Sequence, residues 1–289
     1  MKSIHTLVDD IYNLFTPGDH EISEEFVEEL GRQVAETVAS RIQEAQGGER
    51  KGGLRMSNVG RPERQLYYEV HGVGEEGQKP EELKPQTMLQ FMFGDVWESI
   101  LLYLAKEAGH TVTHEQGEVT LNGVKGHNDA IIDGVVVDVK SASPFAIKKF
   151  ETKSVVEDDP FGYMEQLSGY CEAHGKLDGA FLAVQKVTGK LVLCDFSWED
   201  LEMYNVSERI DYMRDVLDDS EPPDRCYDPV PEGKSGNLKL DTGCKYCAFK
   251  HHCWSDANDG IGLRTFIYSD GPRHFTHVEK TPRTEEVTF

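Results

Sequence analysis

The most constraining stretch of this chain is Gly126 to Ser141, whose sequence predicts two strands joined by a two-residue turn. Asp133-Gly134 forms that turn, because glycine tolerates the positive φ that such turns require and aspartate tolerates it better than most residues. Val, Ile and Ala on both sides favour strands. We therefore expect strands at about 124–132 and 135–142, with Ile132 facing Val135.

A turn centred between residues 133 and 134 fixes the register of the whole pair. Asp129 then faces Asp138, and His127 faces Lys140 one step further along the same face. Two opposed carboxylates repel each other, and a divalent cation between them replaces repulsion with attraction. Two carboxylates and an ammonium group on one face are typical of metal-dependent phosphodiester cleavage. A solvated hairpin face with scattered charges is the competing interpretation.

Composition limits the classes of protein to be considered. The 289 residues suffice for a sizeable core, and no apolar run approaches the ~20 residues that span a bilayer. The first residues carry charges that interrupt any signal sequence, so we expect no membrane association and a cytoplasmic location. The net charge of −22 argues against broad attraction to nucleic acid. It still permits a nuclease, because a carboxylate metal site itself adds negative charge.

The remaining elements follow from hydrophobic spacing and turn signals. Ser3 and Ser23 can each cap a helix within residues 1–46, which we interpret as a packing or dimerising helix pair. Further elements are predicted in this order: helices at 57–68 and 86–108, a strand at 112–121, a short helix after Pro144, a helix at 160–173, strands at 179–187 and 190–196, and a helix at 197–217. This order predicts a mixed α/β (α+β) core whose central sheet is flanked by helices.

Four segments are expected along the chain. They are an N-terminal helical segment at 1–50, a core at 51–217, a Cys-rich segment at 218–260 and a mildly basic, partly disordered tail at 261–289. Composition changes at Asp218, and a Pro-containing linker follows it.

Four motifs lie in order on the predicted elements: Gly94-x3-Glu98, Gly126-x2-Asp129, Asp138-Val139-Lys140 and Gln166-x3-Tyr170. Together they resemble the PD-(D/E)xK nuclease superfamily, specifically its RecB-like exonuclease branch. That branch includes the CRISPR-associated adaptation nucleases and many phage-encoded exonucleases. The resemblance covers about residues 57–195 and implies a restriction-endonuclease-like core with Mg²⁺-dependent deoxyribonuclease activity.

The resemblance also implies a metal site. Asp129 and Asp138 would bind Mg²⁺ or Mn²⁺ directly, since hard cations prefer oxygen ligands. The backbone carbonyl of Val139 is the usual further ligand in this family, and Glu98 would complete the site or help to hold a second ion.

Further residues are assigned to catalysis and to DNA binding. Lys140 would orient or deprotonate the attacking water and stabilise charge on the phosphate oxygens. Gln166 and Tyr170 would position the scissile region. Candidate contacts to the DNA backbone are Arg61, Arg64, His127, Lys148 and Lys149.

The second group of candidate ligands is a set of cysteines. Cys244-x2-Cys247-x5-Cys253 contains the chelate loop that zinc and iron–sulfur sites share, and Cys226 precedes it. Free thiols in a turn are the alternative, although a paired chelate loop in a cytosolic protein favours metal.

Relatives with a 4Fe–4S cluster use such a triplet with a fourth Cys before the nuclease core, at a position matched here by Arg61 or Pro62. This chain departs from that pattern. We favour Cys226 as the fourth ligand, with a 4Fe–4S cluster ahead of Zn²⁺; loss of the metal is a further alternative. Cys171 and Cys194 are expected to be buried.

The resulting expectation is an exonuclease that acts on linear duplex or single-stranded DNA in recombination, repair or degradation. A structure-specific endonuclease of the same fold is the first alternative, and a catalytically weak DNA-binding or assembly subunit is the second. A third is a metal-stabilised interaction protein. A homo-oligomer built by the N-terminal helices and a recombination or replication protein are the protein partners considered. If the chain is phage-encoded, its location is the host cytoplasm.

Overall fold

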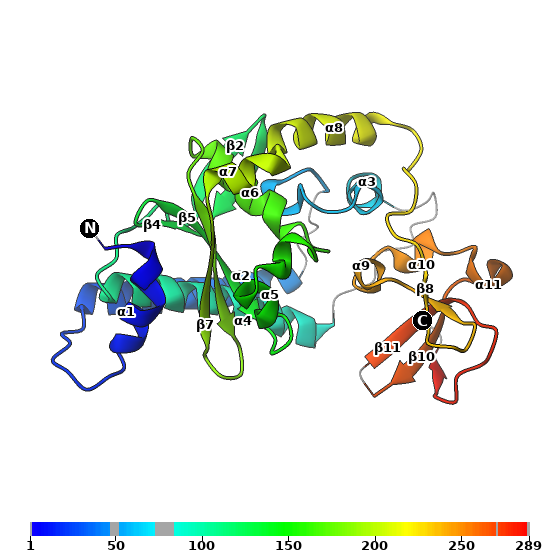
Figure 1. Ribbon diagram of the computed structural model, residues 1–289, viewed down its shortest axis with the longest axis horizontal. Coiled ribbons are helices and arrows are strands. Elements are labelled where there is room, and N and C mark those ends of the chain that lie inside the picture. The colour runs from blue at the N-terminus through cyan, green and yellow to red at the C-terminus, as the bar shows by residue number, and fades with distance from the viewer. Residues whose placement is uncertain (1, 47–51, 73–83, 270, 288–289) are drawn as a thin grey trace. The chain divides into compact units, whose positions relative to one another are not determined.

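The computed structural model describes residues 2–46, 52–72, 84–269 and 271–287 (Figure 1). The chain forms two compact units. The first comprises Met1–Gly60 and Leu83–Tyr212, and the second comprises Arg61–Glu82 and Met213–Phe289. This division differs from the four expected segments, because Arg61–Glu82 groups with the C-terminal part and the rest of the expected core, up to Tyr212, groups with the N-terminal residues. The expected boundary at residue 50 lies outside the described residues.

The first unit is built on a five-stranded mixed sheet. Its strand order is β1 (Val112–Thr113), β4 (Ala130–Ile132), β5 (Val135–Ala142), β6 (Gly179–Gln185) and β7 (Leu191–Phe196). The β5–β6 pair is parallel and the other pairs are antiparallel. A separate hairpin consists of β2 (Gly117–Leu121) and β3 (Val124–Asn128). A mixed sheet flanked by helices is what the sequence predicts.

The helices of this unit surround the sheet. They are α1 (Leu7–Asn13), α2 (Glu24–Ala45), α4 (Pro85–Glu107), α5 (Ile147–Glu151), α6 (Tyr163–Ala173), α7 (Trp198–Leu201) and α8 (Val206–Asp218), with 3-10 turns η1 (Ile4–Thr6), η2 (Met56–Asn58), η3 (Ser154–Val156) and η4 (Glu202–Tyr204). The boundary between the two units falls within α8. Of the helices in the described residues, none has the length and hydrophobicity that crossing a bilayer requires.

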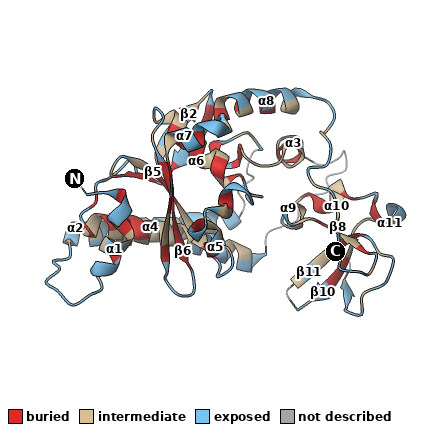
Figure 2. Ribbon diagram, in the orientation of Figure 1, coloured by how far each residue is buried: buried red, intermediate tan, exposed pale blue. Residues whose placement is uncertain are grey.

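Residues of β4, β5 and β6 are largely buried (Figure 2), and they pack into two apolar clusters, one on each face of the sheet. Ile132 and Val137 pack with apolar residues of α1 and α4 on one face. Val136 and Phe181 pack with residues of α5 and α6 on the other. Because successive residues of β5 point to opposite faces, Asp138 lies on the same face as Val136, toward α6.

The β4–β5 hairpin confirms the predicted turn. Asp133 and Gly134 both have positive φ, 51° and 90°, and Ile132 pairs with Val135. The ladder then ends at the pair Ala130–Val137.

The single strand expected at 124–132 is interrupted at Asp129, which separates β3 from β4. One carboxylate oxygen of Asp129 accepts a hydrogen bond from the Val139 amide at 2.7 Å, so its side chain takes a backbone donor of β5. The predicted pairing of His127 with Lys140 is therefore wrong, because β3 pairs with β2 and His127 faces Glu118.

Two other predicted elements are also interrupted. The strand expected at 112–121 is divided into β1 and β2, and His114 and Gln116 between them have positive φ. The helix expected at 197–217 is divided into α7, η4 and α8, with Asn205 in the left-handed conformation at the break. The predicted caps are confirmed: Ser3 accepts from the backbone before α1, and Ser23 accepts from the Phe26 amide of α2.

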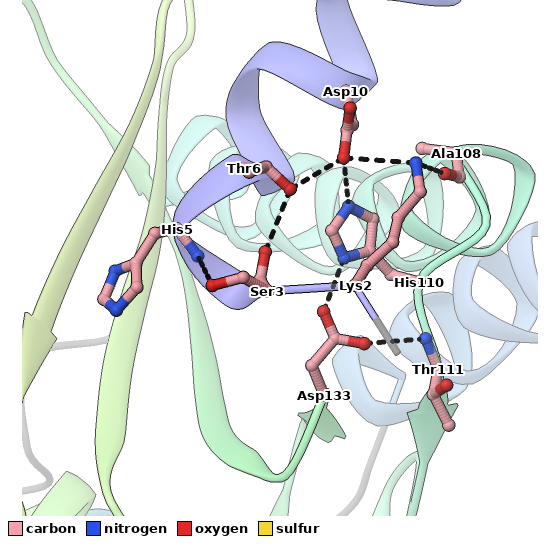
Figure 3. A network of polar contacts seen from close by, with 9 residues as sticks. All are labelled: Lys2, Ser3, His5, Thr6, Asp10, Ala108, His110, Thr111 and Asp133. Carbon is pink, nitrogen blue, oxygen red and sulfur yellow. Dashed lines mark hydrogen bonds and ion pairs between the residues drawn. The ribbon is translucent and has the colours of Figure 1, made fainter.

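A buried histidine ties α1 to the turn of the β4–β5 hairpin (Figure 3). His110 Nδ1 lies 2.6 Å from a carboxylate oxygen of Asp133, and Nε2 lies 3.2 Å from Asp10 of α1. The other Asp133 oxygen accepts from the Thr111 amide at 3.0 Å. Lys2 lies 3.1 Å from Asp10, which extends the network to the N-terminal residues.

The second unit contains short helices and a small sheet. Its helices are α3 (Glu63–His71), α9 (Thr242–Lys245), α10 (Lys250–Cys253) and α11 (Ala257–Gly260). Its strands, in spatial order, are β12 (Glu286–Val287), β10 (Arg264–Tyr268), β11 (Gly271–His277), β9 (Leu238–Lys239) and β8 (Val230–Pro231). The tail expected to be partly disordered thus supplies three strands, and the buried rings of Phe266 and Phe275 pack edge to face at 5.5 Å.

Candidate active site

Strand β5 carries a carboxylate and an ammonium group in contact. The Lys140 Nζ lies 2.5 Å from Oδ2 of Asp138, and Asp138 is only 2% exposed. Both residues point toward α6 because they are two apart on one strand. A buried charge is costly unless it is paired, so this contact compensates both groups.

Helix α6 completes the surroundings of Lys140. Gln166 Oε1 accepts a hydrogen bond from Lys140 at 3.2 Å, and Gln166 Nε2 donates to the Tyr170 hydroxyl at 3.3 Å. The expectation that Gln166 and Tyr170 share one helix face is confirmed. The Tyr163 ring also contacts Lys140, whose Nζ lies 4.5 Å from the ring centre. Sequence reasoning missed Tyr163, although its position three residues before Gln166 places it on the same face of the helix.

The other two carboxylates reach the site from different elements. Asp129 lies at the interruption between β3 and β4, and Glu98 comes from α4. Both line a cleft of about 550 Å³ between residues of α2, α4 and the segment at 115–116. Glu98 accepts a hydrogen bond from the Gln116 side chain, a partner that the sequence analysis did not identify.

The carboxyl groups of Glu98 and Asp129 are harder to ionise than usual. Burial raises the pKa of Glu98 to about 7, aided by the charges of Asp138 and Asp95 and opposed by the Gln116 hydrogen bond. Burial, followed by the charges of Asp138 and Glu98, raises the pKa of Asp129 well above its usual value. The site therefore holds carboxylates that resist ionising together in the absence of a cation.

Lys140, unlike the carboxyl groups, favours its charged form. Burial alone would favour its neutral form, but the Asp138 carboxylate and the nearby Tyr163 and Asp129 raise the pKa of Lys140 above its ordinary value. Burial raises the pKa of the Tyr170 hydroxyl, which remains a neutral hydrogen-bonding group. Lys140 thus favours its cationic form.

The donor set suits a divalent cation. Glu98, Asp129 and Asp138 supply hard oxygen donors whose mutual repulsion a cation would relieve. As they stand in the described part of the chain, no three or more His, Cys, Asp or Glu side chains are gathered as around an ion. Instead, Asp129 accepts a hydrogen bond from the Val139 amide, and Asp138 is ion-paired with Lys140.

An arginine from α2 reaches the same cleft. Arg41 makes a two-bond pair with Asp95 of α4, with distances of 2.5 and 3.0 Å, and also contacts Glu44 at 2.9 Å. Asp95 lies one turn before Glu98 on α4. The pair fastens α2 to the helix that supplies a candidate metal ligand.

The candidate DNA contacts of the first unit lie in different settings. Lys149 is paired with Asp158 at 2.7 Å, whereas Lys148 is exposed on the same short helix, α5. His127 is exposed on β3, opposite Glu118.

The two candidate arginines belong to the second unit and make contacts within it. Arg61 lies 2.6 Å from the carboxylate of Glu69. Arg64 donates to the backbone carbonyl of Pro223 and lies over the Tyr68 ring at 5.4 Å. These contacts fasten α3 within its own unit.

The four candidate cysteine ligands belong to the second unit. Cys226, Cys244, Cys247 and Cys253 all line one cavity of about 30 Å³, and Pro62 lines the same cavity. All four are free thiols. Burial first, and then the neighbouring thiols, raise the pKa of Cys247 to about 11.

Two further cysteines, Cys171 and Cys194, are fully buried in the first unit, as predicted. They pack within the apolar core on the α6 face of the sheet.

No family model and no curated protein matches this sequence. Among the solved structures similar to it are three, each with low sequence identity and a low TM-score. The crystal structure of SSO0001 has 15% identity, covers 77% of this chain and 93% of its own, and gives a TM-score of 0.40. LHK-Exo in complex with dAMP has 14% identity, coverage of 57% and 90%, and a TM-score of 0.35. An alkaline exonuclease (LHK-Exo) from Laribacter hongkongensis has 15% identity, coverage of 63% and 94%, and a TM-score of 0.31.

Proposed function

We propose that this chain is a divalent-metal-dependent deoxyribonuclease. It would hydrolyse phosphodiester bonds of DNA as an exonuclease. The observation that carries the proposal is the buried pair of Asp138 and Lys140, whose charges act on the carboxyl groups of Glu98 and Asp129. A binding module has no need of two further carboxyl groups within electrostatic reach of such a pair.

The residues have distinct roles in this proposal. Glu98, Asp129, Asp138 and the Val139 carbonyl would hold Mg²⁺ or Mn²⁺. Such an ion supplies Lewis acidity toward a phosphate oxygen and promotes the ionisation of water. It would also neutralise the charge that raises the pKa values of the carboxylates.

Lys140 would act on the phosphate itself. Its raised pKa keeps it cationic, so stabilising negative charge on the phosphate oxygens fits better than removing a proton from water. Gln166 accepts from Lys140 and donates to Tyr170, which fixes the direction of the ammonium group. These two residues are positioning residues in this scheme.

The test is digestion of matched linear and covalently closed DNA by the purified protein with Mg²⁺ or Mn²⁺. Loss of linear DNA alone, abolished by Asp138→Ala and by Lys140→Ala, would support the exonuclease. Glu199→Ala, which removes an exposed carboxylate of α7, is the matched control and should retain activity.

Two other outcomes would change the proposal. Cleavage of the closed circle as well would identify a structure-specific endonuclease with the same active site. Failure to cut either DNA with either metal, together with DNA binding, would favour a binding or assembly subunit.

We also propose that the second unit holds a structural metal centre on Cys226, Cys244, Cys247 and Cys253, a 4Fe–4S cluster in preference to Zn²⁺. The support is the convergence of four free thiols on one small cavity. Because none of these cysteines belongs to the unit that holds the carboxylates, the centre is assigned to folding. Absorbance near ~400 nm would indicate iron–sulfur, and a colourless protein with chelatable metal would indicate zinc.

A further inference from the structure

An exposed aromatic ring, that of Phe161, stacks on the ring that contacts the Lys140 ammonium group. Lys140 Nζ is 4.5 Å from the centre of the Tyr163 ring, and the Phe161 ring stacks on Tyr163 with 5.5 Å between centres and 30° between planes. Phe161 is nevertheless 43% exposed. A flat apolar surface therefore adjoins the group that we assign to the phosphate.

The loop that carries Phe161 is held firmly. One oxygen of the Asp159 carboxylate accepts from the Phe161 amide at 3.2 Å, and the other accepts from the Met164 amide at 2.8 Å. Between the two rings, Gly162 has φ of 72° and packs on Gly60, so that a Cβ there would lie 2.4 Å from the Gly60 carbonyl carbon. The backbone thus fixes where the ring stands before any ligand binds.

We propose that Phe161, supported by Tyr163, is the stacking site for the nucleobase next to the scissile phosphate. The inference rests on the proposed nuclease function and specifies its substrate. A paired base inside a duplex is covered on both faces by its neighbours, so a base within the strand can lie on a side chain only when it is unpaired. The preferred substrate is accordingly DNA with an unpaired nucleotide at the cleavage point, either a single strand or the frayed end of a duplex.

The chemistry of a nucleotide matches this arrangement. Its phosphate is an anion suited to Lys140, and its base is a flat π-system suited to Phe161. Stacking on an aromatic ring is tolerant of sequence because every base has a π-face. The site would therefore distinguish unpaired from paired DNA without selecting a particular base.

The test measures stacking apart from cleavage. The probe is a single strand of about 12 nucleotides carrying 2-aminopurine at one end, bound in Ca²⁺ so that binding is observed without turnover. Stacking quenches 2-aminopurine fluorescence, so the wild type should quench the probe. Phe161→Leu keeps apolar bulk but loses the π-face, and should reduce the quenching and weaken binding about tenfold.

Two variants make the result specific. Phe161→Tyr restores an aromatic ring and should recover both quenching and affinity. Phe15→Leu alters another exposed aromatic residue, 73% exposed after α1, and should change neither. Cleavage by Phe161→Leu should lose its preference for single strands over blunt duplex ends.

The outcomes separate this inference from the proposed function. If the wild type cleaves DNA but Phe161→Leu binds and quenches as the wild type does, the stacking site is refuted and the nuclease stands. If the wild type neither binds nor cleaves DNA, the proposed function fails and this inference fails with it.

Discussion

The Lys140 Nζ and a carboxylate oxygen of Asp138 lie 2.5 Å apart on one strand, and both side chains are largely buried. In the proposed function, the lysine would also contact the phosphate of a DNA substrate. We expect Lys140→Met, which keeps the length of the chain, to lower the rate of DNA cleavage by about 10²–10³-fold at saturating DNA. Steady-state cleavage of linear DNA would measure the effect.

Lys125→Met is the matched control for that experiment. Lys125 is an exposed lysine of β3 that pairs with Glu118, and its loss should leave the rate unchanged. Full activity of Lys140→Met would show that this lysine does not stabilise the reacting phosphate.

Glu98 links stability to pH in the metal-free protein. Burial raises its pKa in the folded state from 4.5 to about 7, so the folded state binds the proton more tightly than the unfolded state does. The stability contributed by this group therefore falls as pH rises between these two values and stays low above pH 7.

We expect metal-free Glu98→Gln to exceed the wild type in stability by about 2 kcal/mol at pH 8, with the difference vanishing near pH 4.5. Urea unfolding in chelator across this range would measure it. Added Mg²⁺ should stabilise the wild type more than the variant. A constant difference at all pH values would contradict the assigned ionisation.

The proposed metal centre can be tested by moving one cysteine ligand to another position that lines the same cavity. Cys226→Ala should lose most of the bound metal, because three thiols remain for a four-ligand centre. Since Pro62 lines the same cavity, adding Pro62→Cys to that variant should restore binding. Metal content and the visible spectrum give the result.

Cys194→Ala is the control for the relocated ligand, because Cys194 is buried in β7 of the first unit and should not affect metal content. Undiminished metal in Cys226→Ala would exclude Cys226 as a ligand.

The contacts of His110 predict a stabilising role. Both ring nitrogens lie within hydrogen-bond distance of carboxylate oxygens, and the ring is buried. We expect His110→Gln to reduce the free energy of unfolding by about 2–3 kcal/mol, since contacts to two carboxylates are lost and the Asp133 carboxylate stays buried. Thermal and urea unfolding would measure this, and a loss below that of exposed His5→Gln would contradict it.

Local signals predicted much of this fold. The turn at Asp133-Gly134 depends on two adjacent residues, and its register followed from them. The Ser23 cap and the shared helix face of Gln166 and Tyr170 also depend on neighbours in sequence. Such features are recoverable because their causes lie within a few residues.

The features that were missed depend on contacts between distant residues. The interruption at Asp129 follows from a hydrogen bond to Val139, across a hairpin, and no propensity of Asp129 itself indicates it. Likewise β9 pairs with β11, more than thirty residues later, and no signal near Leu238–Lys239 indicates that pairing. Gln116 was missed for the same reason, because its partner Glu98 lies on α4.

The single residue between β3 and β4 also has a mechanical consequence. Asp129 joins two hairpins that belong to different sheets, so its backbone conformation sets the direction of one hairpin relative to the other. Its side chain holds that conformation through Val139, and its backbone carbonyl accepts from the Gln116 amide at 3.0 Å. A ligand bound to the Asp129 carboxylate would consequently stabilise this junction, and slower amide exchange throughout β2–β3 would accompany occupation of the site.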